Sequence, residues 1–260
     1  MIEELTAGVW KVGGGSWLGV AQACSSEDDC NVYLIAAGDA LLLIDTGRRA
    51  GKAMIEANIR EAGFRPESLT NLLLSHSHFD HSDAASAWQS NYDVAVHLNR
   101  TGTEYLERGD HRLVGYQILT EPGYEFQQFR VDHRIDDAEV FDVGDLTIEA
   151  RAMAGHTPDS MVFETTVRGH RLWICGDTTF AKDCTGEWGC IGWQNILWES
   201  DLEVYRASLE RMLDMSPPDL LLPGHGNTVS GEETIRRAVE ASHATVVEMM
   251  ANPHRRHFGL

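Results

Sequence analysis

The chain has 260 residues and a formal net charge of −19, from 40 acidic and 21 basic residues. So acidic a surface repels phosphate backbones, which argues against a nucleic-acid partner. No apolar stretch approaches the roughly 20 residues that a membrane span requires. Residues 1–4 are acidic and are not followed by the apolar core of a signal peptide. We therefore expect a cytoplasmic protein that acts neither on nucleic acid nor in a membrane.

The five cysteines are odd in number and scattered, as is typical of reduced thiols in a cytoplasmic chain. Cys24 and Cys30 flank an acidic loop, and Cys184 and Cys190 share another. Either pair has the spacing to close a small disulfide loop, so both pairings stay open. Cys175 ends an apolar run with no base beside it, and we interpret it as a buried core cysteine.

No repeat or linker divides the chain, so we predict one domain over residues 1–260. Hydrophobic patterning in the first half predicts strands at 7–13, 31–36, 40–45, 71–75 and 94–98, with helices at 50–62 and 83–89. Residues 100–130 carry several aromatic and charged residues around a turn at 122–123, and we predict a helical excursion over one face of the sheet.

The second half repeats this order of strands and helices. It predicts strands at 139–141, 146–153, 161–166, 171–175 and 220–222, and helices at 202–212 and 231–250. Two similar halves, each with helices outside its strands, predict an α/β protein. Its two sheets would pack face to face, with helices on both outer surfaces.

The most informative segment is the apolar run at 72–74, which is followed at once by His76, His78, Asp80 and His81. Imidazole and carboxylate are the ligands that suit zinc and its neighbours. Two histidines separated by one residue can aim both rings at one ion, while Asp80 and His81 on the next bend can face a second ion. Four such residues directly after a strand therefore predict a metal site.

Three more candidate ligands, His156, Asp177 and His225, each follow a glycine at the end of a predicted strand. Glycine lets the backbone turn sharply and approach a site closely. Taken singly, each residue could instead be a helix cap or a turn residue. Together with the first cluster they make seven candidate ligands, all at strand ends.

This pattern resembles that of the metallo-β-lactamase superfamily of hydrolases, whose hallmark is His-x-His-x-Asp-His. The resemblance runs from the Asp45-Thr46-Gly47 turn to the turn at His225, and it implies an αββα four-layer sandwich with a dinuclear site between the sheet edges. It implies a first metal held by His76, His78 and His156, and a second held by Asp80, His81 and His225. It also implies that Asp177 bridges the two metals and that Asp45 supports the metal-binding loops from behind.

Two divalent ions, most often Zn²⁺ with Fe, Mn or Co as alternatives, can share a bridging hydroxide that attacks a carbonyl or phosphoryl centre. Asp80 and Asp177 are then the expected catalytic carboxylates, since Asp80 can orient the hydroxide or shuttle a proton. An aspartate at the bridging position disfavours β-lactams as substrates. We expect hydrolysis of a lactone or another carboxylic ester of a small molecule. The oligomeric state stays open, with a homodimer as the commonest assembly of soluble chains.

Two other activities stay open. One is a glyoxalase-II-like thioesterase, and the other is a mono-iron enzyme of the persulfide dioxygenase type, which needs only His76, His78 and His156. Asp159 stands where many relatives carry a glycine after the proline of this segment. That departure keeps the metal ligand but leaves the subfamily open. A purely structural metal module is disfavoured, because aromatic loops accompany the ligands and a structural site is closed.

Aromatic residues in two segments are candidate substrate contacts. Tyr124 lies in the excursion at 100–130, and Trp188 and Trp193 lie in the loop at 187–193. Aromatic side chains also fill protein cores. Each of these three residues could therefore either pack in the core or contact an apolar arm of the substrate.

Overall fold

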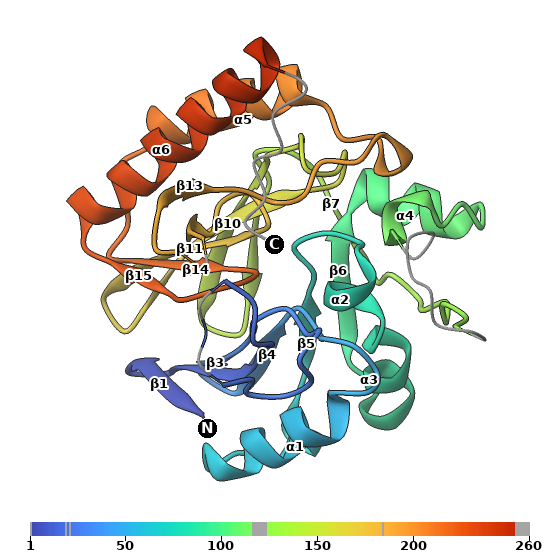
Figure 1. Ribbon diagram of the computed structural model, residues 1–260. Helices are drawn as coiled ribbons and strands as arrows, with labels where there is room; N and C mark the ends of the chain where they lie inside the picture. The colour runs from blue at the N-terminus through green and yellow to red at the C-terminus, as the bar shows by residue number, and fades with distance from the viewer. Residues whose placement is uncertain (1, 19, 21, 116–123, 184, 253–260) are drawn as a thin grey trace.

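The computed structural model describes residues 2–252, apart from residues 19, 21, 116–123 and 184 (Figure 1). Within these residues the first sheet has the strand order β1-β2-β3-β4-β5-β6-β7, and the second has the order β15-β14-β11-β10-β9-β8. The strands of the first sheet are β1 (Glu3–Thr6), β2 (Val9–Gly13), β3 (Val32–Ala37), β4 (Ala40–Ile44), β5 (Asn71–Leu73), β6 (Ala95–Asn99) and β7 (His133–Ile135). Those of the second are β8 (Val140–Val143), β9 (Leu146–Ala152), β10 (Met161–Val167), β11 (His170–Gly176), β14 (Leu220–Pro223) and β15 (Val229–Ser230). A small ribbon pairs β12 (Ala181–Lys182) with β13 (Trp188–Cys190).

Helices cover the outer face of each sheet (Figure 1). The first sheet carries α1 (Lys52–Glu61) and α3 (Ala85–Tyr92), and the second carries α5 (Leu202–Leu213) and α6 (Glu232–Ala251). The other described helices are α2 (Phe79–Ser82), α4 (Arg100–Glu107) and the 3₁₀ turns η1 (Pro66–Ser68), η2 (Arg112–Val114) and η4 (Ile196–Trp198). The predicted αββα sandwich is confirmed.

Three hydrophobic cores hold the four layers together. Successive side chains of a strand point to opposite faces, so Leu34 packs toward α1 and α3 whereas Ile35 faces the second sheet. Ile174 faces the first sheet in the same way, and its neighbour Trp173 packs against α5 and α6. Strands buried on both faces read as continuous apolar runs, which is why residues 41–44 and 72–74 are aliphatic throughout.

Parallel pairing places the candidate ligands at one end of the two sheets. β4 runs parallel to β5, and β11 runs parallel to β14. The carboxyl ends of parallel neighbours meet at the same sheet edge, where ligands bind in open α/β sheets. Asp45 and His76 follow the first pair of strands, and Asp177 and His225 follow the second.

The excursion predicted at 100–130 lies partly outside the described residues, because 116–123 are not among them. Its described part is helical in α4 and in η2, and residues 124–130 are irregular. Among the described residues, no helix is both long enough and apolar enough to cross a membrane.

The structure tests two of the predictions made for cysteines. Cys30 is a buried free thiol, so the pairing of Cys24 with Cys30 is not formed. Cys175 is fully buried as well, which confirms its interpretation as a core residue. The pairing of Cys184 with Cys190 cannot be followed, since Cys184 lies outside the described residues.

A chain of polar contacts links β6 to β7 away from the candidate ligands. The Nδ1 atoms of His97 and His133 lie 3.0 Å apart, and Nε2 of His97 lies 2.8 Å from Oδ1 of Asn71. Nε2 of His133 lies 2.7 Å from Oε1 of Glu139. Burial, and then the neighbouring His133, lower the pKa of His97 to about 4.

This pair predicts a loss of stability in acid. An unfolded histidine titrates near pH ~6.5, so between pH 6.5 and 4 the unfolded chain binds a proton that folded His97 refuses, and unfolding becomes easier. Between pH 7.5 and 4.5 we expect the free energy of unfolding to fall by about 2 kcal/mol more in the wild type than in His97→Gln. Urea denaturation at both pH values measures this difference, with the exposed His170→Gln as the control. Equal losses in all three proteins would show that His97 titrates normally.

Candidate metal centre

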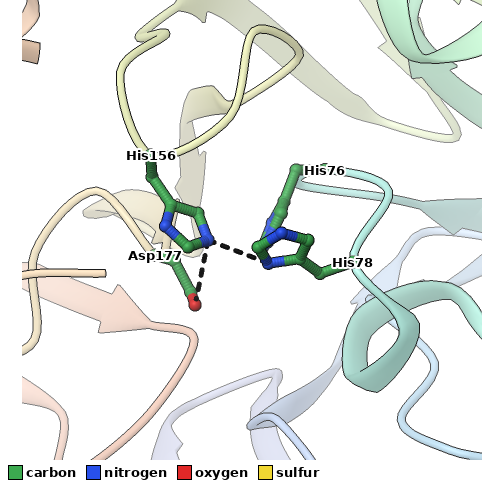
Figure 2. A group of neighbouring side chains, drawn as sticks. All are labelled: His76, His78, His156 and Asp177. Carbon is green, nitrogen blue, oxygen red and sulfur yellow. Dashed lines mark hydrogen bonds and ion pairs between the residues drawn. The ribbon is translucent and has the colours of Figure 1, made fainter. Parts of the chain in front are cut away.

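Two groups of buried histidine and aspartate side chains meet at the carboxyl ends of the strands. In each group the candidate ligand atoms lie within 4.8 Å of one another. The first group is His76, His78, His156 and Asp177 (Figure 2), and the second is Asp80, His81 and His225. Each of these side chains belongs to a residue that is at most 7% exposed. The structure thus brings together all seven residues that the sequence singled out.

The segment after β5 supplies residues of both groups. His76 and His78 lie on the extended loop that leaves β5, with their ring centroids 4.7 Å apart. The chain then forms the single turn of α2, which carries Asp80 and His81. Figure 2 shows His156 and Asp177 approaching His78 from other loops. Residues that lie close together in this segment therefore contribute to two neighbouring groups of candidate ligands.

Asp177 lies between the two groups. Its Oδ2 atom is 3.5 Å from Nε2 of His156 in the first group and 3.7 Å from Nε2 of His225 in the second. Its Oδ1 atom is 3.1 Å from Nε2 of His81. Asp80 stays within the second group, with Oδ2 at 3.0 Å from Nε2 of His225. One carboxylate therefore reaches both groups, as the predicted bridging role requires.

Two glycines leave the space that this carboxylate and its neighbours need. A Cβ atom on Gly224 would lie 2.2 Å from Oδ1 of Asp177 and 2.7 Å from Cε1 of His81. At Gly176, which has a φ of +45°, a Cβ atom would lie 2.6 Å from Oγ of Ser75. Close approach of backbone to the site therefore explains both glycines.

Asp45 supports the site from behind. Its Oδ1 accepts a hydrogen bond from the backbone N–H of Ser75 at 2.7 Å, and its Oδ2 accepts one from the Ser75 hydroxyl at 2.8 Å. The same Oδ2 lies 2.8 Å from Nδ1 of His81. A carboxylate on one ring nitrogen orients the imidazole and leaves the other nitrogen for a metal, which is the position the sequence predicted for Asp45.

The charges of the site suit a cation. Burial, together with neighbouring histidines, lowers the pKa of His76 and of His78 well below the usual value, so both rings stay neutral and keep a lone pair. Burial alone would raise the pKa of Asp177, but His81 and His225 hold it well below its usual range. At these three residues, the neutral imidazoles and the ionised carboxylate are the protonation states in which such groups bind metals.

The polar atoms left without partners point to the same conclusion. Among the described residues, Nε2 of His76 and Nε2 of His78 are buried without a hydrogen bond. Nε2 of His81 and Oδ1 of Asp177 are also buried and face each other at 3.1 Å without the geometry of a hydrogen bond. Such atoms are uncommon in folded proteins and cost about 1–3 kcal/mol each. Metal ions would satisfy them, so the donor set fits one or more divalent cations.

The three predicted substrate contacts lie in different surroundings. The Tyr124 hydroxyl donates to Oδ1 of Asp83 at 3.1 Å, and the Arg49 guanidinium lies over its ring. The backbone oxygen of Trp193 lies 2.6 Å from Nδ1 of His156, so this residue helps to orient a candidate ligand. Trp188 lies on β13 and lines a surface cavity. Contact with substrate stays a prediction for all three.

Sequence reasoning missed several residues that contact the candidate ligands. Trp17 stacks on His225 with ring centroids 5.2 Å apart and is 41% exposed, and the buried Trp198 packs edge-on against His78 at 4.5 Å. Asp159 accepts a hydrogen bond at 2.5 Å from the hydroxyl of Ser77, the residue between His76 and His78. Of these residues, only Asp159 was noted in the sequence, because it stands where many relatives carry a glycine after the proline. Trp17 comes from a loop and Trp198 from the short 3₁₀ turn η4, and the sequence of neither segment predicts where it packs.

The comparisons with known proteins agree with this geometry. The family model described as the metallo-beta-lactamase superfamily matches residues 26–225. "Probable metallo-hydrolase YqgX" of Bacillus subtilis is 26% identical over 200 residues, which cover 75% of this chain and 84% of that protein. "Acyl-coenzyme A thioesterase MBLAC2" of Homo sapiens is 26% identical, covering 82% of this chain and 78% of that one. "Hydroxyacylglutathione hydrolase" of Acidiphilium cryptum is 26% identical, with 87% and 76% covered.

Solved structures support the fold. A metallo-beta-lactamase from Cronobacter sakazakii with a mutated HARLDQ motif superposes with a TM-score of 0.74 at 20% identity, covering 97% of this chain and 98% of that one. A subclass B3 enzyme of Bradyrhizobium japonicum gives a TM-score of 0.70 at 18% identity, with 97% and 92% covered. With the family model matching most of its length, the chain belongs to the metallo-β-lactamase superfamily, as a metal-dependent hydrolase with a buried histidine and aspartate cluster.

Proposed function

We propose that the chain hydrolyses the acyl bond of a small-molecule carboxylic ester with the help of two divalent metal ions. The observation that carries this proposal is the position of Asp177, whose two carboxylate oxygens face His156 on one side and His81 on the other. A single carboxylate shared in this way suits paired ions, which form a catalytic arrangement common in hydrolases.

In this proposal the ligand roles follow the two groups. The first ion would be held by His76, His78 and His156, the second by Asp80, His81 and His225, and both by Asp177. Bound divalent ions would supply an acidified water molecule and polarise the carbonyl oxygen of the substrate.

The remaining steps belong to the chain itself. Asp80 is 7% exposed, and one of its oxygens faces His225, so it can accept a proton near the reacting atoms. Asp45 fixes the ring of His81. Trp17, half-exposed over His225, can exclude water from one side of the substrate.

Two substrate classes are candidates. A lactone is the substrate that the sequence pattern favours for an aspartate-bridged member. A thioester is favoured by the relatives, because two of them are named as hydrolases of an acyl-coenzyme A and of a hydroxyacylglutathione. The mono-iron alternative is less favoured, because it would leave the second buried group, Asp80, His81 and His225, without an ion.

Metal analysis of the purified protein, combined with a pH-indicator screen of lactones, esters and thioesters, tests the proposal. We expect two divalent ions per chain, most often Zn²⁺, and release of acid from at least one of these classes. The class with the highest kcat/KM decides between lactone and thioester. One iron per chain with oxygen uptake and no acid release would overturn the proposal in favour of the dioxygenase.

A further inference from the structure

The first ligand group is built from two loops that belong to different sheets. His76 and His78 lie on the loop after β5 of the first sheet, and His156 lies on the loop between β9 and β10 of the second (Figure 2). Nε2 of His156 is 2.9 Å from Nδ1 of His78, so a small shift between the loops would separate these ligands. The sheets face each other through apolar side chains, whose packing is non-directional. A directional contact between the two loops is therefore needed to fix the geometry of the group.

Asp159 makes such a contact. Its Oδ2 accepts a hydrogen bond at 2.5 Å from the hydroxyl of Ser77, which stands between the two histidines of the other loop. Both residues are 0% exposed. A backbone hydrogen bond from the N–H of Met161 to the carbonyl of Ser75, at 2.9 Å, joins the same two segments. Since Asp159 follows His156 by three positions, its carboxyl ties the two loops together beside the ligands themselves.

The second ligand group has different contacts between the sheets. The side-chain amide of Asn31 donates to the backbone oxygen of Pro223 at 2.9 Å, and the hydroxyl of Tyr33 donates to the same oxygen at 2.7 Å. Both donors lie on or beside β3 of the first sheet, and His225 follows Pro223 by two positions. Separate side chains thus fix the two groups, so loss of the Asp159 contact should disturb the first group and spare the second.

Stability alone does not explain a carboxyl at this position. Oδ1 of Asp159 is buried without a hydrogen bond in the described part of the chain, and burial raises the pKa of the group. A buried polar atom without a partner costs stability. The surroundings nevertheless make room for the pair, because a Cβ atom on Gly102 of α4 would lie 2.4 Å from Oδ2 of Asp159 and 2.7 Å from Oγ of Ser77. The packing of α4 therefore preserves this one hydrogen bond.

We propose that Asp159 is a positioning residue for the first metal ion: through Ser77 it holds the loop of His76 and His78 against the loop of His156. The inference rests on the proposed function, in which these three histidines hold one ion. It goes beyond that function by assigning to Asp159 an effect on one ion that the other ion does not share.

Competition with a chelator tests this selectivity. A chelating indicator removes the Zn²⁺ ions of the loaded full-length protein in turn and gives an affinity for each. His156→Ala and His225→Ala, which each remove one proposed ligand, identify which affinity belongs to which ion. In Asp159→Ala we expect the first ion to bind about 10- to 100-fold more weakly, as when outer partners of a metal site are lost, and the second to change less than about 2-fold.

Two further variants separate positioning from folding. Asp159→Asn keeps an oxygen that can accept from Ser77, so it should restore most of the affinity for the first ion. Gly102→Ala leaves both partners in place and favours α4 as a helix, but its Cβ would force the pair apart. It should therefore weaken the first ion although the helix that carries it is stabilised, a result that a merely structural role of Asp159 does not produce.

Tyr33→Phe is the matched control, because it removes one buried hydrogen bond between the sheets on the side of His225. It should leave the affinity for the first ion unchanged. Equal weakening of both ions in Asp159→Ala, or no weakening of the first, would overturn the positioning role while two ions and hydrolysis in the wild type keep the proposed function. A wild type that holds a single ion rejects paired-metal hydrolysis instead, and the positioning role then requires that Asp159→Ala weaken that ion.

Discussion

Replacing Asp177 by Ala is expected to abolish both hydrolysis and the binding of paired metal ions. Its carboxylate is the group that reaches His156 and His225 through one oxygen and His81 through the other, so its loss leaves three buried imidazoles without their shared anion. We expect kcat/KM to fall by more than about 1,000-fold, beyond the 10–100-fold that outer partners of a metal site contribute. Metal content per chain should fall from two ions toward one or none.

Two further variants make this result interpretable. Asp177→Asn keeps the size of the side chain and removes its charge, so it should lose paired metal without a large loss of folding. Asp214→Asn removes an exposed carboxylate at the end of α5 and should leave metal content and rate unchanged. Full activity with two bound ions in Asp177→Ala would show that another group bridges the metals.

Replacing Asp45 by Asn is expected to weaken metal binding about 10- to 100-fold without removing any proposed ligand. Asp45 accepts two hydrogen bonds from Ser75 and holds Nδ1 of His81. An amide cannot accept on both sides of its head group, so either Ser75 or His81 loses its partner. Titration with Zn²⁺ against a chelating indicator measures the affinity, and circular dichroism verifies that the variant folds.

The contact with Ser75 offers the control for that experiment. Ser75→Ala removes the hydroxyl that bonds to Asp45 but keeps the backbone N–H and the contact of Asp45 with His81. The same hydroxyl lies 3.1 Å from Nδ1 of His76 and 3.3 Å from Nδ1 of His81, so these two contacts are lost as well. Its metal affinity should fall less than that of Asp45→Asn. If Ser75→Ala weakens metal binding as much as Asp45→Asn does, the carboxylate acts by shaping the loop rather than by orienting His81.

Most of the candidate metal centre could be predicted from the sequence, because four of its seven candidate ligands lie close together along the chain. His76, His78, Asp80 and His81 fall within six positions after an apolar strand, and such spacing fits a metal site better than a core. The layer order was also readable, since strands buried on both faces are continuously apolar and surface helices are not. The hairpin at β12–β13 was missed and interpreted as loop, because two- and three-residue strands carry too few residues to show a period.

Relations between distant segments were decided only by the tertiary structure. That Asp177 lies between the two groups depends on parallel pairing of β11 with β14 and on the space left by Gly224. That Lys182 and Arg237 flank Trp188 depends on α6 packing over the β12–β13 ribbon, 55 positions along the chain from Lys182 to Arg237. Residue types and local spacing determine which groups can bind a metal, because ligand chemistry is a property of side chains. Which groups share a carboxylate or line a cavity is set by strand pairing and helix packing, which no single segment of the sequence encodes.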